Sequence, residues 1–277
     1  MSSIDDHRIF YANFIVRSAG SSNEKLIAAF AAVKREHYVG SGPWSIFVSP
    51  GYISTASNDP SLLYQDIVVA IAPERKINNG QPTLHARCLA ACAPGPGEAI
   101  VHIGAGTGYY TAILATLIGS AGQVSAYEIE SDLAIRAAEN LRHLSNVSVV
   151  AASASEGRLP EADVIYVSAG ATHPLGMWLD ALKIGGRLIF PMTANSGFGV
   201  MLMVTRRNKD GYGAAIVSQA GFIPCFGARD DAASQALSAA LQSRAILAAK
   251  SLRRGAAADD TACCVGRDWW LSTAEPA

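Results

Sequence analysis

From residue 99 onward, short apolar runs of strand length alternate with longer runs of helical character, and this alternation restricts the chain to few folds. Strands that are separated by helices rather than by tight turns favour parallel pairing. A parallel sheet needs helices over both faces, so the sequence predicts an α/β fold. The expected strands are 99–103, 122–129, 147–152, 162–170 and 187–192, and the expected helices are 108–119, 131–144 and 174–186.

A hairpin signal follows this alternating region. Two strand-like runs, 200–207 and 212–219, flank Asn-Lys-Asp-Gly at 208–211, which is a turn sequence typical of antiparallel pairs. We therefore expect the mostly parallel sheet to end in an antiparallel strand. The alanine-rich residues 231–255 predict a helix, and residues 263–273 predict another strand. The stripe expected on that helix is Leu237, Leu241, Ala245, Ala248 and Leu252.

The N-terminal region up to residue 75 is predicted to be mainly helical. Residues 23–39 have helical periodicity, with an N-cap expected at Ser22 or Asn23. Residues 41–52 contain Gly and Pro and are expected to form a loop. The face expected to be buried on the helix carries Leu26, Ile27, Phe30 and Val33.

Composition excludes several classes of protein. Half of the 277 residues are hydrophobic, 16% are charged and the net charge is −1, so we expect a large core and no nucleic-acid partner. The first residues are polar and acidic, unlike a secretory signal, and no stretch reads as a membrane span. The five cysteines contain no Cys-x-x-Cys pair. We therefore expect a protein of the reducing cytoplasm, without a metal site.

Three glycines at alternate positions follow the strand expected at 99–103. Glycine lets a ligand approach the backbone closely, but the dinucleotide fingerprint needs its third glycine at position 109, where this chain has Tyr. The spacing therefore suits a nucleoside without a pyrophosphate. Glu128 ends the next expected strand, where a carboxylate can bind both ribose hydroxyls. The residues expected to bind the nucleoside are Gly104, Ala105, Gly106, Thr107, Gly108, Tyr109, Glu128 and Ile129.

The segments around this turn resemble a methyltransferase core that uses S-adenosylmethionine. More specifically, the chain resembles the protein-L-isoaspartate O-methyltransferase family over about residues 8–227. The resemblance implies a Rossmann-like class I methyltransferase fold and S-adenosylmethionine as the cofactor. It rests on residues 103–119, 127–141 and 182–192, on the helix signature at 29–39, on Tyr64-Gln65-Asp66, and on Gly80-Gln81-Pro82 with 86–92 in the place of the substrate loop. It divides the chain into an N-terminal helical and substrate-loop region (1–92), a cofactor-binding core (93–227) and a C-terminal extension (228–277).

Two departures from the family pattern fall on the cofactor side. His102 stands where the family has an acidic residue that holds the amino-acid end of the cofactor. Its imidazole either bonds the cofactor's carboxylate or amine, or is a satisfied, partly buried group. Ser153 and Ala154 stand in the family's Gly-Asp-Gly segment, which implies a position near the adenine.

A third departure falls on the acceptor side. An ungapped alignment places the family's active-site hydroxyl at Gly80, which cannot orient a carboxylate by hydrogen bonding. Asn78, Asn79 or Gln81 could replace it, or a shifted alignment could recruit Thr83. A carboxylate with a pKa of about 4 is already ionised at neutral pH, so the enzyme mainly supplies proximity and orientation.

Two histidines are candidates for proton transfer if the acceptor is a weaker acid. His85 follows the Gln-Pro loop, and His173 follows the strand expected at 162–170. An imidazole can take a proton at neutral pH, although a surface or capping role is the plainer interpretation of each. The candidate catalytic residues are Asn79, Gly80, Gln81, His85 and His173.

The sequence leaves three functions open. The first is an S-adenosylmethionine-dependent methyltransferase acting on an isoaspartyl-type carboxylate. The second is a specialised methyltransferase acting on an O, N or C atom of another peptide or small molecule, and the third is a non-catalytic S-adenosylmethionine-binding protein. The glycine spacing disfavours an NAD-dependent oxidoreductase. The expected partner is the methyl acceptor, and the C-terminal extension offers a surface for a homo-oligomer.

Overall fold

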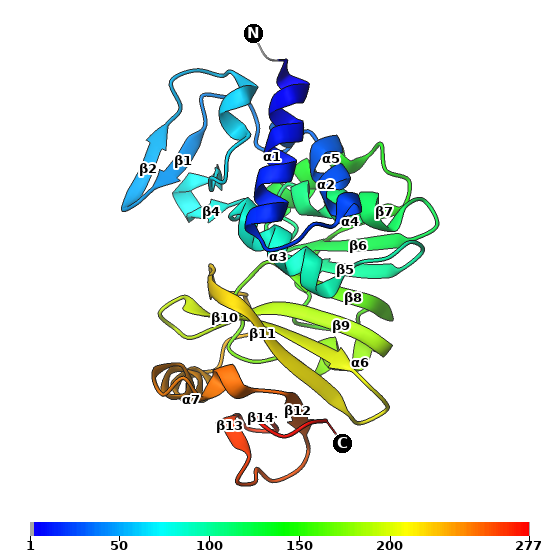
Figure 1. The fold of residues 1–277 in the computed structure, drawn as a ribbon, viewed down its shortest axis with the longest axis vertical. Helices are drawn as coiled ribbons and strands as arrows, with labels where there is room; N and C mark the ends of the chain where they lie inside the picture. The colour runs from blue at the N-terminus through cyan, green and yellow to red at the C-terminus, as the bar shows by residue number, and fades with distance from the viewer. Residues whose placement is uncertain (1–2, 277) are drawn as a thin grey trace. The chain divides into compact units, whose positions relative to one another are not determined.

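The computed structural model describes residues 3–276, which form two compact units (Figure 1). The first unit contains the residues up to Glu98 and Ala105–Ala152, and the second contains Ala99–Gly104 and the residues from Ser153 onward. The chain passes from one unit to the other inside the glycine turn, between Gly104 and Ala105. The three-part division expected from the sequence stays a prediction.

Five of the described α-helices belong to the first unit. Two helix starts show why the sequence folds locally as it does: Ser3 and Asp6 form a capping box on α1, and Asn23 caps α2, as predicted. Helix α4 begins directly after Gly108, whose φ of +97° lies in the left-handed region. The helices are α1 (Ile4–Ser18), α2 (Glu24–Ala32), α3 (Pro82–Cys92), α4 (Tyr109–Ile118) and α5 (Ser131–Leu141).

The strands of the first unit are short apart from one parallel pair. Strands β6 (Gln123–Glu128) and β7 (Val147–Ala151) pair in parallel, as expected for this α/β class. Two hairpins precede them: β1 (Ser45–Val48) with β2 (Gly51–Ser54), and β3 (Ala70–Ala72) with β4 (Ile77–Asn78). Three 3₁₀ helices complete the unit, namely η1 (Arg35–His37), η2 (Pro60–Leu63) and η3 (Pro73–Arg75).

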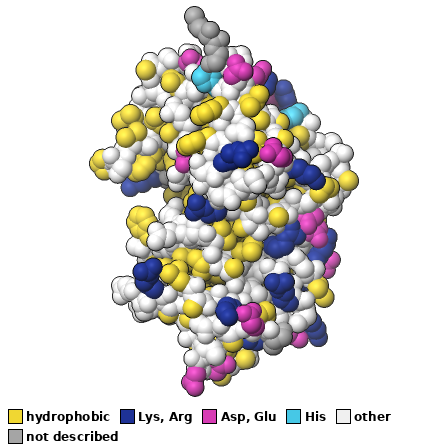
Figure 2. Space-filling view, viewed as in Figure 1, with side chains coloured by type: hydrophobic (Ala, Val, Ile, Leu, Met, Phe, Trp, Pro, Cys, Tyr) yellow, Lys and Arg dark blue, Asp and Glu magenta, His cyan; other side chains and the backbone are white. Residues whose placement is uncertain are grey.

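The β1–β2 hairpin corrects the prediction of a loop at residues 41–52. Ile46 pairs with Ile53 and Phe47 pairs with Tyr52. Residues of these types favour strands, and only Ser49 and Pro50 reverse the chain between the two strands. Figure 2 shows hydrophobic side chains gathered over this hairpin, where Phe47, Val48, Tyr52 and Ile53 are exposed.

The second unit is a sheet whose parallel part is followed by a longer antiparallel part. Strand order within the unit is β13-β14-β12-β11-β10-β9-β8-β5. Strands β5, β8 and β9 pair in parallel, and every pair from β9 to β13 is antiparallel. The predicted α/β fold is therefore confirmed, and its antiparallel end is larger than one strand. The strands are β5 (Ala99–Ile103), β8 (Ala162–Val167), β9 (Leu182–Thr193), β10 (Phe198–Arg206), β11 (Tyr212–Gly221), β12 (Ser251–Arg254), β13 (Ala262–Val265) and β14 (Trp269–Ser272).

Two predicted helices of the second unit are shorter than expected. Helix α6 (Gly176–Ala181) ends before Gly185 and Gly186, which lie inside β9 because β9 already pairs with β8 at Leu182. Helix α7 (Asp231–Gln242) ends before Arg244, whose φ is +61°.

The residues beyond α7 depart further from the single helix predicted at 231–255. A short 3₁₀ helix, η4 (Ala245–Ala248), follows it, and Leu252 pairs with Tyr212 in strand β12. Residues 263–273, expected to form one strand, form most of the β13–β14 hairpin. Strand pairing here overrides the helix propensity of alanine.

None of the helices in residues 3–276 is both long and apolar enough to cross a membrane.

Candidate active site

The glycine turn of the first unit meets Glu128. Gly106 has a φ of +57°, and its N–H donates to a Glu128 carboxylate oxygen at 2.6 Å. A Cβ on Gly106 would lie 3.0 Å from Ile71 Cδ1, and one on Gly108 would lie 2.7 Å from Leu141 Cδ1. Both positions therefore require glycine for backbone conformation and for space. Thr107 fixes the turn from its other side, because its hydroxyl donates to Tyr38 O at 2.6 Å.

Glu128 is suited to binding a ribose. Glu128 is 6% exposed, and its second carboxylate oxygen accepts the N–H of Glu130 at 3.0 Å. Each oxygen has a second acceptor position left for a hydroxyl. Burial raises the pKa of Glu128, although the backbone hydrogen bonds oppose this. The turn and the carboxylate thus fit the adenosine part of S-adenosylmethionine.

Three other predicted cofactor residues of this unit differ in exposure. Ile129 is exposed beside Glu128, whereas Ala105 is buried. Tyr109 is also buried, and its hydroxyl lies 3.3 Å from that of Tyr11.

The remaining predicted cofactor residues lie in the second unit. Gly104 follows β5 with a φ of +76°, and Ser168 follows the neighbouring strand β8. His102 is 1% exposed, and its Nε2 lies 3.1 Å from Ser168 Oγ. Burial lowers the pKa of His102 to about 3, so the imidazole is neutral at pH 7. It cannot supply the negative charge of the family's acidic residue.

Ser153 and Ala154 lie in a tightly bonded segment of the same unit. Ser153 Oγ lies 2.7 Å from Ser155 Oγ and accepts the N–H of Ser155. The carbonyl of Ala154 accepts the indole N–H of Trp178 at 2.8 Å. These bonds hold the segment independently of any ligand.

The amides of the predicted acceptor loop hold the loop itself. Asn78 Oδ1 accepts the N–H of Gly80 at 2.9 Å, and Asn79 Oδ1 accepts the N–H of Val69 at 3.0 Å. Gln81 Nε2 donates to Asp66 at 2.9 Å. These bonds occupy the amide oxygens of Asn78 and Asn79 and the amide nitrogen of Gln81.

His85 occupies the space in which a side chain at position 80 would lie. Gly80 has a φ of +70°, and a Cβ built on it would overlap His85 Nε2. The imidazole is 3% exposed and stacks on Tyr110 with ring centroids 3.6 Å apart. The structure thus brings together Gly80 and His85, two of the predicted acceptor residues.

Two residues outside the predicted site, Arg35 and Asp66, hold this loop in place. Arg35 is fully buried and donates to Leu63 O at 2.7 Å and to Asn79 Oδ1 at 3.3 Å. Asp66 accepts the N–H of Thr83 at 2.8 Å. A signal was available for both, because Arg35 and Asp66 lie in the two short motifs that carried the family resemblance.

Four buried polar atoms at or beside the loop have no hydrogen-bond partner among the described residues: Arg35 Nε, Asn79 Nδ2, Thr83 Oγ1 and Tyr110 OH. Buried polar groups are normally paired, so these atoms mark a place for water or for an acceptor's polar groups.

His173 lies in the second unit, beside the C-terminal extension. Its Nδ1 is 2.9 Å from Thr172 Oγ1, and its ring is parallel to that of Trp269 with centroids 6.3 Å apart. Burial lowers the pKa of His173, whereas Asp230 and Asp268 oppose the shift. The imidazole is therefore neutral at pH 7 and can accept a proton.

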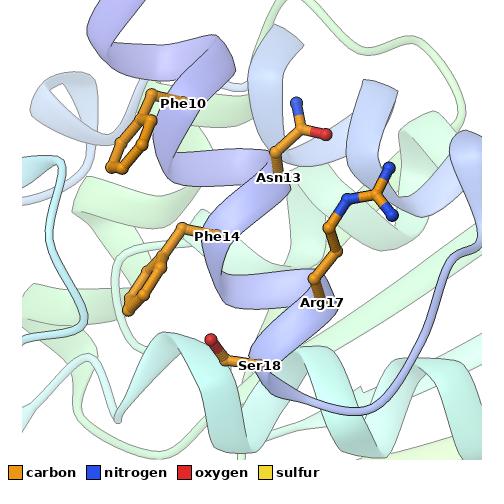
Figure 3. A pocket seen from close by; sticks show the side chains of 5 residues that line it. All are labelled: Phe10, Asn13, Phe14, Arg17 and Ser18. Carbon is orange, nitrogen blue, oxygen red and sulfur yellow. The ribbon is translucent and has the colours of Figure 1, made fainter.

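A pocket of about 390 Å³ on the outer face of α1 contains none of these residues (Figure 3). It is lined by Phe10, Asn13, Phe14, Arg17 and Ser18. No group of three His, Cys, Asp or Glu side chains in residues 3–276 could hold a metal ion.

A strand, a glycine turn, a helix and a carboxylate at the end of the next strand define the class of Rossmann-like, S-adenosylmethionine-dependent methyltransferases. Comparison with protein families agrees, because the family described as protein-L-isoaspartate(D-aspartate) O-methyltransferase matches residues 14–230. The chain belongs to this family. Residues 231–277 lie outside the match.

Individual relatives carry the same name. A protein-L-isoaspartate O-methyltransferase of Brucella anthropi is 32% identical over 189 residues, which cover 65% of this chain and 80% of the relative. A protein-L-isoaspartate O-methyltransferase of Ignicoccus hospitalis is 30% identical over 167 residues, which cover 59% of this chain and 78% of the relative. A Plasmodium falciparum structure of such an enzyme, solved with S-adenosyl-L-homocysteine, has a TM-score of 0.64 at 18% identity and covers 79% of this chain and 98% of its own. This chain is accordingly an S-adenosylmethionine-dependent methyltransferase.

Proposed function

We propose that this methyltransferase acts on an isoaspartyl carboxylate of a peptide or protein. Family membership supports the acceptor, and the observation that carries the cofactor assignment is the bond from Gly106 N to Glu128 at 2.6 Å. It places the turn and the carboxylate that would hold the adenosine in one arrangement. The other residues that we propose for cofactor binding are Gly104, Ala105, Thr107, Tyr109, Ile129, His102, Ser153 and Ala154.

The residues of the acceptor loop have only to position an already ionised nucleophile. S-adenosylmethionine supplies a methyl group on a positively charged sulfur, and transfer to a carboxylate oxygen releases a neutral thioether. The acceptor needs no base, because a carboxyl pKa of about 4 leaves it ionised at neutral pH. Proximity and orientation then account for most of the rate.

We assign the orienting role to His85 and its neighbours. The family's hydroxyl position is Gly80, and the imidazole of His85 fills the space beside it. Thr83 Oγ1 and Asn79 Nδ2 are unpaired donors at the same loop, and each can bond a carboxylate oxygen. Gln81 orients the loop through Asp66.

A second acceptor class is supported by the two histidines. An acceptor hydroxyl or amine must lose a proton during methyl transfer, and a neutral imidazole is suited to accept it. His173 is held neutral by burial, and His85 lies at the acceptor loop. A specialised acceptor of this kind remains the alternative proposal.

One assay separates these proposals. Methyl transfer from labelled S-adenosylmethionine is measured to an isoaspartyl peptide, to the same peptide with ordinary aspartate, and to a panel of small alcohols and amines. A methyl ester releases labelled methanol in base, whereas an N-, C- or ether-linked methyl group does not. The expected result is a base-labile product on the isoaspartyl peptide alone. A base-stable product would favour the specialised acceptor, and binding without any product would favour a non-catalytic protein.

We further propose that the protein acts in the cytoplasm without binding nucleic acid, and that the C-terminal extension pairs two copies. The five cysteines without a Cys-x-x-Cys pair support the cytoplasm, and the net charge of −1 supports the absence of a nucleic-acid partner. The exposed Leu247 and Val265 of the extension support the pairing. Light scattering on the wild type and on a Leu247→Ser, Val265→Ser variant tests the pairing. A monomeric wild type would refute it.

A further inference from the structure

Within the first unit, the β3–β4 hairpin leads directly into the predicted acceptor loop, and its Ile71 lies beside the cofactor turn. At its open end, Asn79 N donates to Val69 O at 3.0 Å, and the acceptor loop follows directly. In the first strand of the same hairpin, Ile71 places its Cδ1 3.0 Å from the position that a Cβ on Gly106 would take. A ligand that approaches the backbone of Gly106 therefore meets Ile71.

The tip of this hairpin is clamped to the start of α5 by Arg75. The guanidinium binds both carboxylate oxygens of Asp132, at 2.8 Å and 2.7 Å, and also binds Glu130. Glu130 in turn donates its N–H to Glu128. The clamp therefore ends two residues from the carboxylate that would bind the ribose.

A second bond ties the hairpin to the same helix. Arg136, on α5, donates to the carbonyl of Ile71 at 3.0 Å. The hairpin is thus fixed at two points. Arg75 holds its tip, and Arg136 holds Ile71, the residue that lies beside Gly106.

The ion pairs at the tip are too exposed to serve mainly as folding contacts. The side chains of Arg75, Glu130 and Asp132 are 33%, 37% and 55% exposed, and exposed pairs contribute little to stability. A guanidinium that binds Asp132 through two bonds and also pairs with Glu130 and the adjacent Glu74 restricts orientation strongly. Its geometry suits a contact that holds one segment in place.

We propose that the β3–β4 hairpin is a strap over the cofactor turn and that Arg75 is the positioning residue that keeps it closed. Opening requires Arg75 to leave Asp132 and Glu130, and it also requires Ile71, whose carbonyl Arg136 holds, to move away from Gly106. The strap slows release of the nucleoside cofactor and product. Because β4 ends at Asn78, two residues before Gly80, closure of the hairpin also fixes the position of the acceptor loop.

The test compares Arg75→Ala with a matched control, Arg142→Ala. Arg142 also pairs with a carboxylate on α5, Glu139 at 2.6 Å, but does not contact the hairpin. The readouts are the dissociation rate of S-adenosylhomocysteine by stopped flow, its dissociation constant by calorimetry, and Tm. We expect Arg75→Ala to release S-adenosylhomocysteine about threefold to tenfold faster, with Tm close to that of the wild type and Arg142→Ala unchanged.

A charge reversal distinguishes the ion pair from a general structural effect, because only the ion pair predicts that a second, opposite charge change restores slow ligand release. Arg75→Glu should release the ligand faster still, and combining it with Asp132→Arg should restore slow release at least in part. In 1 M NaCl the difference between wild type and Arg75→Ala should shrink, because exposed ion pairs are screened. Equal release rates for Arg75→Ala and Arg142→Ala, or no recovery in the charge reversal, would overturn the strap.

The strap rests on the cofactor assignment, and the same experiment separates the two failures. A wild type that does not bind S-adenosylhomocysteine would refute the cofactor site itself. A wild type that binds it with a release rate insensitive to Arg75 would refute only the strap.

Discussion

At Gly80 the backbone has a φ of +70°, and a side chain there would overlap the imidazole of His85. An alignment shows only that a hydroxyl is missing at this position. The structure shows that another side chain has taken its space. The acceptor loop is therefore a different arrangement and not the family's loop with one group deleted.

Gly80→Ser should consequently not restore a family-like site. A left-handed conformation costs a non-glycine residue about 1–2 kcal/mol, and overpacking against His85 adds about 1–3 kcal/mol. We expect Tm to fall and methylation of an isoaspartyl peptide not to rise. The double variant with His85→Ala should regain the overpacking part of the lost stability. A Gly80→Ser protein as stable as the wild type would contradict the packing of His85 against Gly80.

Gly106→Val should abolish binding of S-adenosylmethionine. Its side chain would crowd Ile71 Cδ1 and strain a backbone with a φ of +57°, which would distort the turn that we propose binds the cofactor. Gly97→Val is the control, because Gly97 also has a positive φ, +79°, but nothing lies within 4 Å of its Cβ position. Calorimetry should show no binding for the first variant and wild-type affinity for the second. Equal affinities would place the cofactor elsewhere.

Glu128 should make cofactor affinity depend on pH. Its pKa is raised by burial, so the folded protein takes up this proton at a higher pH than the unfolded chain does. Protonation at low pH therefore favours folding through this residue but removes the charge that binds the ribose. We expect affinity to weaken as pH falls from about 7 toward the raised pKa.

The matched variants isolate this carboxylate. Glu128→Gln should show a flatter pH dependence, and Glu128→Ala should bind at least about tenfold more weakly at pH 7, since each hydrogen bond to a charged group contributes about 1.5–3 kcal/mol. Calorimetric titrations over pH give both results. A loss below about threefold in Glu128→Ala would indicate another ribose partner.

At the scale of elements, the sequence predicts structure correctly where the deciding interactions lie within one segment. The cap of α2 at Asn23 and the β10–β11 hairpin are examples. The predicted helix at 231–255 failed because pairing decides its second half: Ser251 and Leu252 pair with β11 on one side and β14 on the other. Periodicity within the segment does not contain that information.

The helix that does form, α7, should depend on its cap. Asp230 accepts the N–H of Ala233 at 2.7 Å, and Thr172 Oγ1 accepts the N–H of Asp230 at 2.9 Å. Asp230→Ala should lower the free energy of unfolding by about 1 kcal/mol. Asp260→Ala, an exposed position before β13, is the control. Urea unfolding of both variants measures the difference, and equal stabilities would show that the cap contributes nothing.

At the scale of the whole molecule, cofactor binding should stabilise the fold. A ligand that binds only the folded protein at 100 times its dissociation constant adds about 2.7 kcal/mol, which raises Tm by roughly 5–10 °C for a domain of this size. Thermal unfolding with and without S-adenosylhomocysteine measures this shift. Gly106→Val should show none. A ligand-induced shift of the same size in that variant would contradict the assigned turn.

The sequence alone determined the features that are local or repeat along the chain: strand–helix alternation, the glycine turn, Glu128 and the family. Each follows from backbone preference or from spacing that one segment contains. The tertiary structure decided what depends on contacts between distant residues. Examples are the space that His85 takes at Gly80, the burial that makes His102 neutral, and the clamp from Arg75 to α5. Steric overlap, desolvation and ion pairing depend on distances in space, which spacing along the chain does not fix.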